Sequence, residues 1–346
     1  MEPIPETTIP FTTAPHDLQP DIAATSQLLA HGRLEIGKVI AGQTELIDQA
    51  LITVLCRGHA LIEGVPGIAK TLLVKLLGRV LGLQFGRVQA TPDLMPADIL
   101  GTSILRAADA QMIFRPGPVF TDFLLVDEIN RMPPRTQSAL LECMEERQVT
   151  SDTEQRALPD VFTVFATQNP VDFEGTYPLP EAQLDRFLMK IRAGYPTAEE
   201  ERLVLERHHA GFDPGGDTEI APVPVGVLAA AQAEQRRVRI EPALYDYLLG
   251  ITRRTREWPA LTLGASPRAT VSLMRVAQSY AALDGRYFIL PDDVKQAALP
   301  VLRHRIVLRP EAELEGMDAD RVLRDVIAAV PVPRQDAAAE RTVAPR

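Results

Sequence analysis

Cysteine is nearly absent from this sequence. The two cysteines among 346 residues, Cys56 and Cys143, lie far apart and have no metal-ligating residues beside them. This spacing excludes a cysteine metal site and is typical of buried thiols in a reducing compartment. We therefore expect a cytoplasmic protein.

Long apolar runs and a targeting segment are missing as well. Charged residues or prolines interrupt each apolar stretch before it reaches the length of a membrane span, so we expect no membrane-spanning segment. The N-terminus has no basic segment followed by an apolar core, so we expect no secretory signal.

Positive charge is the third shortage. The formal net charge of −10 opposes non-specific binding to nucleic acid, and no basic stretch interleaved with aromatic residues is present. Arginines do cluster at 236–239, 253–256 and 303–305, and we interpret them as solvated faces or subunit contacts. We therefore expect no nucleic-acid partner.

The composition that remains is that of a globular protein with two domains. Hydrophobic residues make up 46% and charged residues 24% of a chain long enough to bury two cores. Residues 1–21 contain five prolines and four acidic residues but no lysine or arginine, which predicts a flexible acidic arm. The Pro- and Ala-rich segment 331–346 predicts a flexible tail.

A candidate phosphate-binding loop lies at 61–71, which reads Leu-Ile-Glu-Gly-Val-Pro-Gly-Ile-Ala-Lys-Thr. An apolar strand at 60–63 leads into it and an apolar helix follows, so backbone N–H groups and a helix N-terminus would face an anion. Lys70 would span the outer phosphates, and the Thr71 hydroxyl would bind Mg²⁺. Ala69 departs from the pattern G-x-x-x-x-G-K-[ST], so an ordinary strand–turn–helix stays open on this evidence alone.

Polar residues end two further apolar runs that we predict as buried strands. Asp127 and Glu128 follow the run at 123–126, and Asn169 follows the run at 161–167. In a doubly wound sheet the carboxyl ends of parallel strands share one edge, beside the phosphate loop. Asp127 would hold Mg²⁺ through water, Glu128 would polarise the attacking water, and Asn169 would contact the γ-phosphate or that water. The signals together predict a P-loop ATPase with ATP and Mg²⁺.

Helical patterns dominate from residue 197, at 198–209, 223–235, 243–254, 268–283 and 292–302. They predict a separate all-helical domain, hinged near 194–196. Ser266 as N-cap would place Arg268 at a helix start, within reach of nucleotide. Arg186, late in a short helix, is either a surface ion-pair donor or a finger directed at a neighbour's γ-phosphate. Short extended stretches at 103–105 and 111–114 predict a hairpin inserted between two elements of the sheet.

The motifs together resemble the AAA+ ATPases, and within them the MoxR family, over about residues 36–330. The resemblance is carried by Glu-Gly-Val-Pro-Gly-Ile-Ala-Lys-Thr at 63–71, Arg-Val-Gln-Ala-Thr-Pro-Asp-Leu-Met-Pro-Ala-Asp at 87–98, Phe-Arg-Pro-Gly-Pro at 114–118, Val-Asp-Glu-Ile-Asn-Arg at 126–131, Ala-Thr-Gln-Asn-Pro at 166–170 and Gly-Thr-Tyr-Pro-Leu-Pro-Glu-Ala-Gln-Leu-Asp-Arg-Phe at 175–187. Ala69 is similar to that family's own form of the loop.

The resemblance implies an α/β fold, an αβα P-loop sandwich with a parallel sheet at 22–196, followed by an all-α lid at 197–330. A hairpin insert at about 90–115 would face the pore of a hexameric ring. Glu128, Asn169, Arg186 and Arg268 would be catalytic, with Arg186 acting on the adjacent subunit and Arg268 on either its own or the neighbour's nucleotide. Arg131 is a further interface candidate. Thr71 and Asp127 would hold the metal. The nucleotide would contact Val39, Ile40, Gly42, Glu63, Gly64, Val65, Pro66, Gly67, Ile68, Ala69, Lys70, Thr71, Leu72 and Asp127.

The function implied by the resemblance is that of a chaperone-like ATPase that remodels or activates a partner protein complex, together with a partner bearing a von Willebrand factor A domain. Three alternatives remain on sequence alone. They are an ATP-gated, ring-forming binding switch, a magnesium-chelatase-like motor subunit, and a nucleic-acid motor, the last opposed by the acidic charge balance.

Overall fold

The structure is a computed structural model of the 346-residue chain, and it describes residues 22–65, 67–106, 111–151, 154–169, 175–213 and 218–333. The predicted arm at 1–21, Pro66 of the phosphate loop and residues 334–346 of the predicted tail lie outside the described residues.

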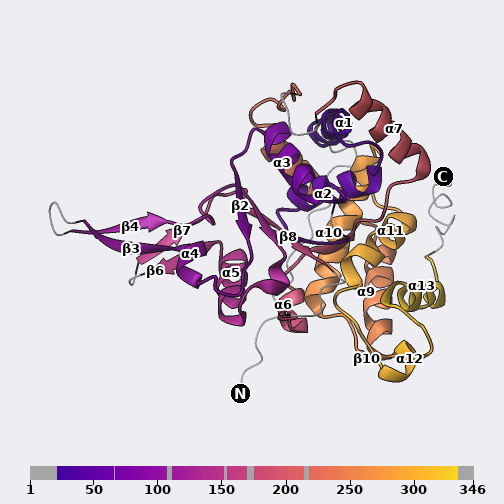
Figure 1. Ribbon diagram of the computed structural model, residues 1–346. Helices are drawn as coiled ribbons and strands as arrows, with labels where there is room; N and C mark the ends of the chain where they lie inside the picture. The colour runs from indigo at the N-terminus through magenta and orange to yellow at the C-terminus, as the bar shows by residue number, and fades with distance from the viewer. Residues whose placement is uncertain are drawn as a thin grey trace, which may run out of the picture.

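The centre of the fold is a sheet of five parallel strands in the order β2-β5-β8-β1-β9 (Figure 1). The strands are β1 (Ala60–Glu63), β2 (Phe85–Gln89), β5 (Phe123–Asp127), β8 (Thr163–Gln168) and β9 (Met189–Arg192). Every residue of β5 is buried, as its continuous apolar run predicts for a strand covered on both faces. β8 begins two residues later than predicted, because Phe162 is still held in a turn by a bond from its N–H to Pro159 O.

Alternate residues of the central strands enter two separate apolar cores. Phe123 and Leu125 face one core, which also contains residues of α1 (Ala23–Gly37), α2 (Thr44–Leu55) and α3 (Lys70–Leu81). Leu124 and Val126 face the other core, which contains residues of α5 (Pro134–Glu146). The predicted αβα sandwich is therefore confirmed.

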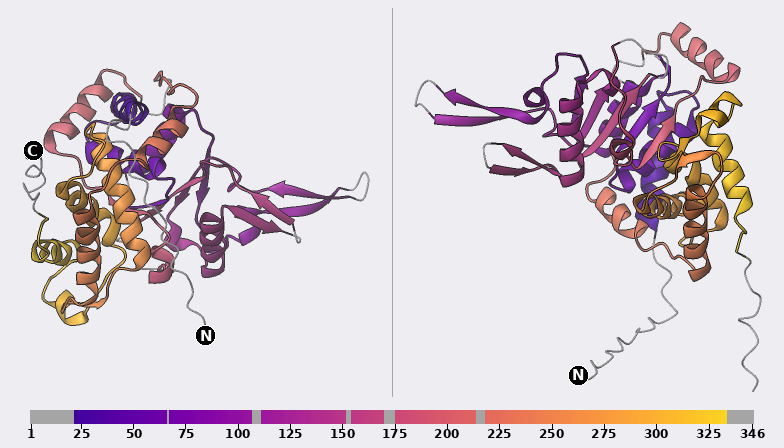
Figure 2. Two further views of the ribbon diagram at one scale, coloured as in Figure 1. Left: turned by 180° about the vertical axis from the view of Figure 1, so that it is seen from behind. Right: turned by 90° about the horizontal axis from the view of Figure 1, so that it is seen from below.

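Two antiparallel hairpins project from the sheet domain on the side away from the second half of the chain (Figures 1 and 2). The first is β3 (Gly101–Arg106) with β4 (Gln111–Pro116), after the short helix α4 (Pro96–Leu100); its turn, 107–110, is outside the described residues. The second is β6 (Gln148–Ser151) with β7 (Glu154–Ala157). The four residues of β7 show no strand-like apolar alternation in the sequence. Arg156 of β7 lies 4.0 Å above the ring of Phe114 in β4, so the two hairpins are in contact.

The second half of the chain is helical and carries one two-stranded ribbon, β10 (Leu261–Leu263) with β11 (Val307–Leu308). Its helices are α7 (Ala198–His209), α8 (Val227–Gln235), α9 (Pro242–Arg256), α10 (Pro267–Leu283), α11 (Pro291–Leu302), α12 (Pro310–Leu314) and α13 (Ala319–Ala329). α8 begins four residues later than predicted, after Gly226 in the left-handed region at φ 91°. Two short elements complete the described chain, η1 (Ile129–Arg131) and α6 (Glu181–Leu184).

One apolar core joins the two halves. α8 packs against α1, α10 contacts α1 and α2, and α11 contacts β9, and buried residues of α9, α10 and α11 belong to the same core as those of α1 to α3. The boundary at 196/197 stays a prediction, since the apolar packing does not divide there. None of the helices in the described ranges has the length and apolar character that crossing a bilayer requires.

Candidate active site

The loop between β1 and α3 has the backbone shape that its glycines suggest. Gly67 and Ala69 both lie in the left-handed region, at φ 89° and φ 58°. A Cβ at Gly64 would come within 2.6 Å of Ala193 O and 2.4 Å of the Ile68 side chain, so only glycine fits this close approach. Ala69 is the N-cap of α3, and Lys70 is the first residue of that helix. The loop therefore presents a helix N-terminus, the arrangement that attracts an anion.

Lys70 lies inside the curve of the loop. Its Nζ donates to Gly64 O and, over 3.2 Å, to Val65 O. Burial lowers the pKa of Lys70, and the carboxylates of Asp127 and Glu128 act in the opposite direction by favouring the charged form. The ammonium group is thus partly desolvated and faces two acidic groups. A lysine that binds phosphate oxygens beside a metal ion needs such surroundings.

The carboxyl ends of three neighbouring strands, β2, β5 and β8, and the phosphate loop surround a cavity of about 400 Å³. Its lining includes Lys70, Thr71, Asp127, Glu128 and Asn169. These five residues come from three separate segments of the sequence, and the structure brings them together as predicted for a phosphate site. The remaining lining residues are Gly67, Ala69, Leu72, Arg87, Gln89 and Thr167.

Asp127 is held by two neighbours that the sequence did not single out. Arg87 Nε donates to Asp127 Oδ2 over 2.7 Å, and Thr167 Oγ1 donates to Oδ1 over 3.3 Å. Thr167 Oγ1 also accepts from the N–H of Glu128 over 2.9 Å. The register Gln89↔Asp127 places the end of β2 beside the acid. The alternation of polar and apolar residues in Arg87-Val88-Gln89 was the available signal for Arg87 and Gln89.

Glu128 turns its backbone at the end of β5. Its φ of 58° is left-handed, which non-glycine residues adopt rarely and mostly at functional turns. Its carboxylate is an ion-pair partner of Arg131, with 3.0 Å between Nε and Oε2, and lies 3.5 Å from the Gln89 amide. Arg131, predicted as an interface candidate, is thus placed beside the acid of its own chain.

The donor set of this cavity fits magnesium. Thr71 supplies a hydroxyl oxygen and Asp127 a carboxylate, which are hard ligands of the kind Mg²⁺ takes. Mg²⁺ usually binds one or two protein oxygens and completes its shell with water and substrate phosphate, so two residues suffice.

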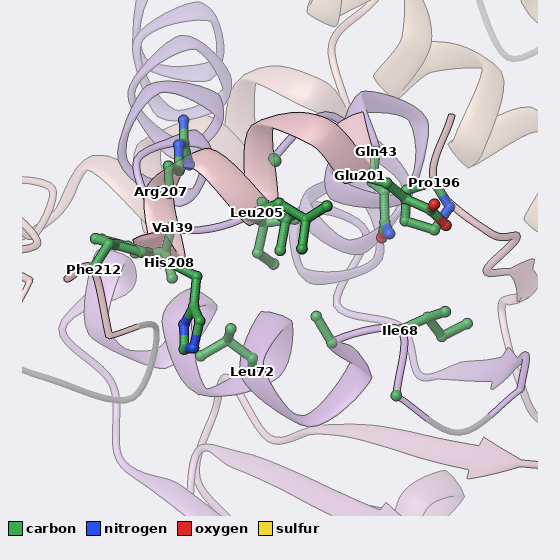
Figure 3. A pocket seen from close by; sticks show the side chains of 15 residues that line it. Val39, Gln43, Ile68, Leu72, Pro196, Glu201, Leu205, Arg207, His208 and Phe212 are labelled. Carbon is green, nitrogen blue, oxygen red and sulfur yellow. The ribbon is translucent and has the colours of Figure 1, made fainter. Parts of the chain in front are cut away.

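A second cavity of about 440 Å³ adjoins the same loop, and Gly67, Ala69 and Leu72 line both. Val39 and Ile40, which we predict to contact the nucleotide, form part of its wall, and Ile68 forms another part (Figure 3). The sequence did not indicate the opposite wall, which comes from α7 and its flanks: Pro196, Glu201, Val204, Leu205, Arg207, His208 and Phe212. Gln43 also lines this cavity, and its Oε1 is buried without a hydrogen-bond partner among the described residues.

Two residues predicted to contact nucleotide have other partners. Glu63 forms ion pairs with β9, at 2.5 Å to Lys190 Nζ and 3.6 Å to Arg192 Nε, and lines neither cavity. Gly42 lies against the lid, where a Cβ would overlap the Glu200 carboxylate. The glycine therefore makes room for Glu200, whose Oε1 accepts from the N–H of Gln43 over 3.0 Å.

Arg186 and Arg268 lie together, apart from the lysine cavity. Both line a third cavity of about 310 Å³, which shares no lining residue with the other two. Glu145, near the end of α5, forms ion pairs with both arginines. Its Oε2 lies 3.2 Å from Arg186 Nε, and its Oε1 pairs with Arg268 Nη2. Arg186 Nη1 donates to Leu141 O over 2.7 Å. Within one chain, neither arginine borders the cavity that contains Lys70.

Comparison with known proteins adds independent findings. The chain matches the model of the ATPase family associated with various cellular activities (AAA) over residues 59–189, and the model of the AAA lid domain over 253–326. It is 40% identical to the chaperone MoxR1 of Mycobacterium tuberculosis over 95% of this chain and 88% of that protein. It is 43% identical to YeaC of Bacillus subtilis over 90% of this chain and 97% of that protein.

The fold also has a solved counterpart. A crystal structure of a candidate ATPase from Cytophaga hutchinsonii superposes with a TM-score of 0.82 at 39% identity, covering 90% of this chain and 97% of the other.

Proposed function

The chain belongs to the MoxR family of AAA+ ATPases, and we propose that it hydrolyses ATP to remodel or activate a partner protein complex. The observation that carries the proposal is the convergence of Lys70, Thr71, Asp127, Glu128 and Asn169 on one cavity. The relative named chaperone MoxR1 supports the remodelling role.

Each residue in the cavity has a distinct task. The loop N–H groups and Lys70 bind the phosphates. In the adjoining second cavity, Gln43 offers the base an oxygen that has no hydrogen-bond partner among the described residues. Thr71 and Asp127 would hold Mg²⁺, which when bound offsets the negative charge of the phosphates. Glu128 accepts a proton from water as the water oxygen attacks the γ-phosphorus, while the bond to the β–γ bridging oxygen breaks and ADP leaves. Asn169 orients the water or the γ-phosphate.

The site is proposed to be completed by a second chain. Arg186 and Arg268 border a cavity separate from that of Lys70, so they act on nucleotide bound by a neighbour in a ring, which the family resemblance implies to be hexameric. A protein client and a von Willebrand factor A domain are the partners proposed. The projecting hairpin β3–β4, with Leu105 and Met112 more than half exposed, would face the pore.

Two substitutions test the chemistry. Glu128→Gln keeps ATP binding and loses turnover by roughly 10²–10⁴-fold, the usual contribution of a general base. Lys70→Ala fails to bind. Nucleotide binding is measured by calorimetry and turnover by phosphate release. Brisk hydrolysis by Glu128→Gln would contradict the site assignment, and turnover that no partner changes, with ATP needed only for assembly, would favour the binding switch.

Mixed assemblies test the shared site. Arg186→Ala keeps ATP binding but loses about 10³–10⁵ in rate, as removal of an arginine finger does. Lys70→Ala, inactive alone, still carries both arginines. Mixing the two variants should restore part of the activity, because the arginine of one chain then serves the nucleotide of the other. No recovery in fully assembled mixtures would count against a shared site.

A further inference from the structure

Glu145 is the residue through which Arg186 and Arg268 meet. One carboxylate oxygen, Oε2, is 3.2 Å from Arg186 Nε, and the other, Oε1, accepts from Arg268 Nη2. The side chains of Glu145, Arg186 and Arg268 are 39%, 30% and 48% exposed, so an approaching ligand can reach all three. A single acid thus holds two guanidinium groups side by side at the surface.

The backbone on which the two arginines stand is fixed by separate, buried contacts. Asp185, next to Arg186, accepts from Arg305 Nε over 2.7 Å and from Ser266 Oγ over 2.9 Å. Ser266 is the N-cap of α10, two residues before Arg268. The Arg305 side chain is 2% exposed and also donates to the carbonyls of Phe187 and Leu188. The segment of Arg186 and the start of α10 are therefore joined without any help from Glu145.

The division of labour follows from these contacts. The contacts of Asp185 with Ser266 and Arg305 fix the backbone from which the two arginine side chains extend. Glu145 joins their charged ends, and Leu141 O also accepts from Arg186. Without the carboxylate, two like charges would repel and spread. With it, a net positive charge remains, and Arg57 and Arg275 line the same cavity. Ion pairs open to solvent are weak, so a phosphate of higher charge can take over both guanidinium groups.

We propose that Glu145 is a positioning residue that presets Arg186 and Arg268 as one pair for the γ-phosphate bound by a neighbouring chain. The inference rests on the proposed function, since it requires a site shared between chains. It assigns Glu145 no contact with ATP bound in its own chain.

The test uses mixtures of a Lys70→Ala chain and an Arg186→Ala chain, with Glu145→Gln added to one or the other. The Lys70→Ala chain supplies arginines and the Arg186→Ala chain supplies the working loop. Glu145→Gln in the Lys70→Ala chain should lower the recovered phosphate release of the mixture roughly tenfold, in keeping with the effect of misplacing a catalytic group. The same substitution in the Arg186→Ala chain should leave the recovered rate unchanged. Glu142→Gln, on the same helix and also exposed, is the matched control in both chains.

The outcomes separate the two levels of the proposal. Recovery that falls equally whichever chain carries Glu145→Gln, or falls in neither, overturns the positioning role while leaving the shared site intact. No recovery even without Glu145→Gln overturns the shared site itself. The supporting result has a second part: Glu145→Gln in the otherwise wild-type chain lowers turnover while the Kd for ATP is unchanged, and Glu145→Asp restores part of the rate.

Discussion

At the scale of single residues, Ala69 shows how a departure from a motif is accommodated. At the position where the motif usually has glycine, Ala69 adopts a left-handed backbone at φ 58° and is the N-cap of α3. A left-handed alanine costs about 1–2 kcal/mol, which a single loop position can sustain. The alanine at position 69 therefore makes the sequence motif harder to recognise but keeps the left-handed backbone that the loop needs.

The left-handed backbone at Ala69 leads us to expect different stabilities for two substitutions at this position. Ala69→Gly should bind ATP as before, with a free energy of unfolding within about 1 kcal/mol of the wild type, because relief of strain offsets the added freedom of the unfolded chain. Ala69→Val should lower the free energy of unfolding by about 1–3 kcal/mol, since a β-branched residue fits this region poorly. Denaturant unfolding and nucleotide calorimetry measure both. Equal stability of the two variants would contradict the strain at this position.

His59 predicts how stability depends on pH. Its Nδ1 accepts from the N–H of Val164 and its Nε2 bonds to Met144 O, so the ring is neutral. Burial, then the charge of Arg147, lowers the pKa of His59 to about 3. The unfolded chain takes up this proton below about pH 6.5, so the stability that neutral His59 supports above that pH is lost progressively as the pH falls towards 3.

The measurement compares the free energy of unfolding at pH 7 and pH 5. The wild type should lose about 2 kcal/mol more over this interval than His59→Gln does. Glutamine can still accept from Val164 and donate to Met144, but it does not titrate. His209→Gln, exposed on α7, is the control. The same pH dependence in His59→Gln and wild type would show that His59 does not carry the effect.

The sequence predicts some site residues and is silent about others for a physical reason. Lys70, Asp127 and Asn169 each stand at the end of an apolar strand or at the start of a helix, so local pattern locates them. Glu145 is one of three glutamates near the end of α5, and it is distinguished by its contacts with Arg186 and with Arg268, which is 123 residues away. Tertiary contacts of this kind leave no local pattern.

At the scale of elements, α7 covers the second cavity and is attached to the rest of the molecule by few contacts. No residue of this helix is buried, although it walls the cavity beside Val39. Glu200 and Thr197 form a capping box, and Glu200 also accepts from the N–H of Gln43. Arg207 Nη1 donates to Lys38 O over 3.1 Å. The helix is therefore attached through polar bonds at its ends rather than by apolar packing.

Weakening that attachment should loosen the cover. Glu200→Gln loses the charge at the capping box, and with a cap worth about 1 kcal/mol we expect amide exchange in α7 to rise roughly fivefold. The affinity for ATP should fall by a similar factor. Glu199→Gln, one residue earlier and exposed, is the control, and hydrogen exchange by mass spectrometry resolves the helix. Unchanged exchange in α7 would mean that other contacts hold it.

Elements were predictable from the sequence where burial imposed a pattern. The continuous apolar run of β5 and the helices α7 to α11 were located to within a few residues, whereas α12 and α13 were not predicted. The second hairpin was not, because its strand β7, Glu-Gln-Arg-Ala, is mostly exposed and lacks an apolar face. Its support is tertiary, in part the contact of Arg156 with Phe114.

At the scale of the whole molecule, a site shared between chains makes activity depend on protein concentration. Phosphate release per chain should fall on dilution in step with the loss of assembled mass, because each nucleotide then loses the neighbour's arginines. Serial dilution with parallel light scattering measures both quantities. Constant activity per chain at dilutions where only single chains remain would contradict the shared site.

The course of α5 gives this assembly a further property. The helix follows Glu128 and η1 at one end and carries Glu145 at the other, just before the second hairpin begins at Gln148. Its 13 residues form a rod of about 20 Å. In a ring, α5 would run from Glu128, which activates water at one nucleotide, to the arginine pair that serves the next nucleotide. The second hairpin follows directly after α5. A displacement of the hairpin would then be transmitted along α5 towards two consecutive nucleotide sites.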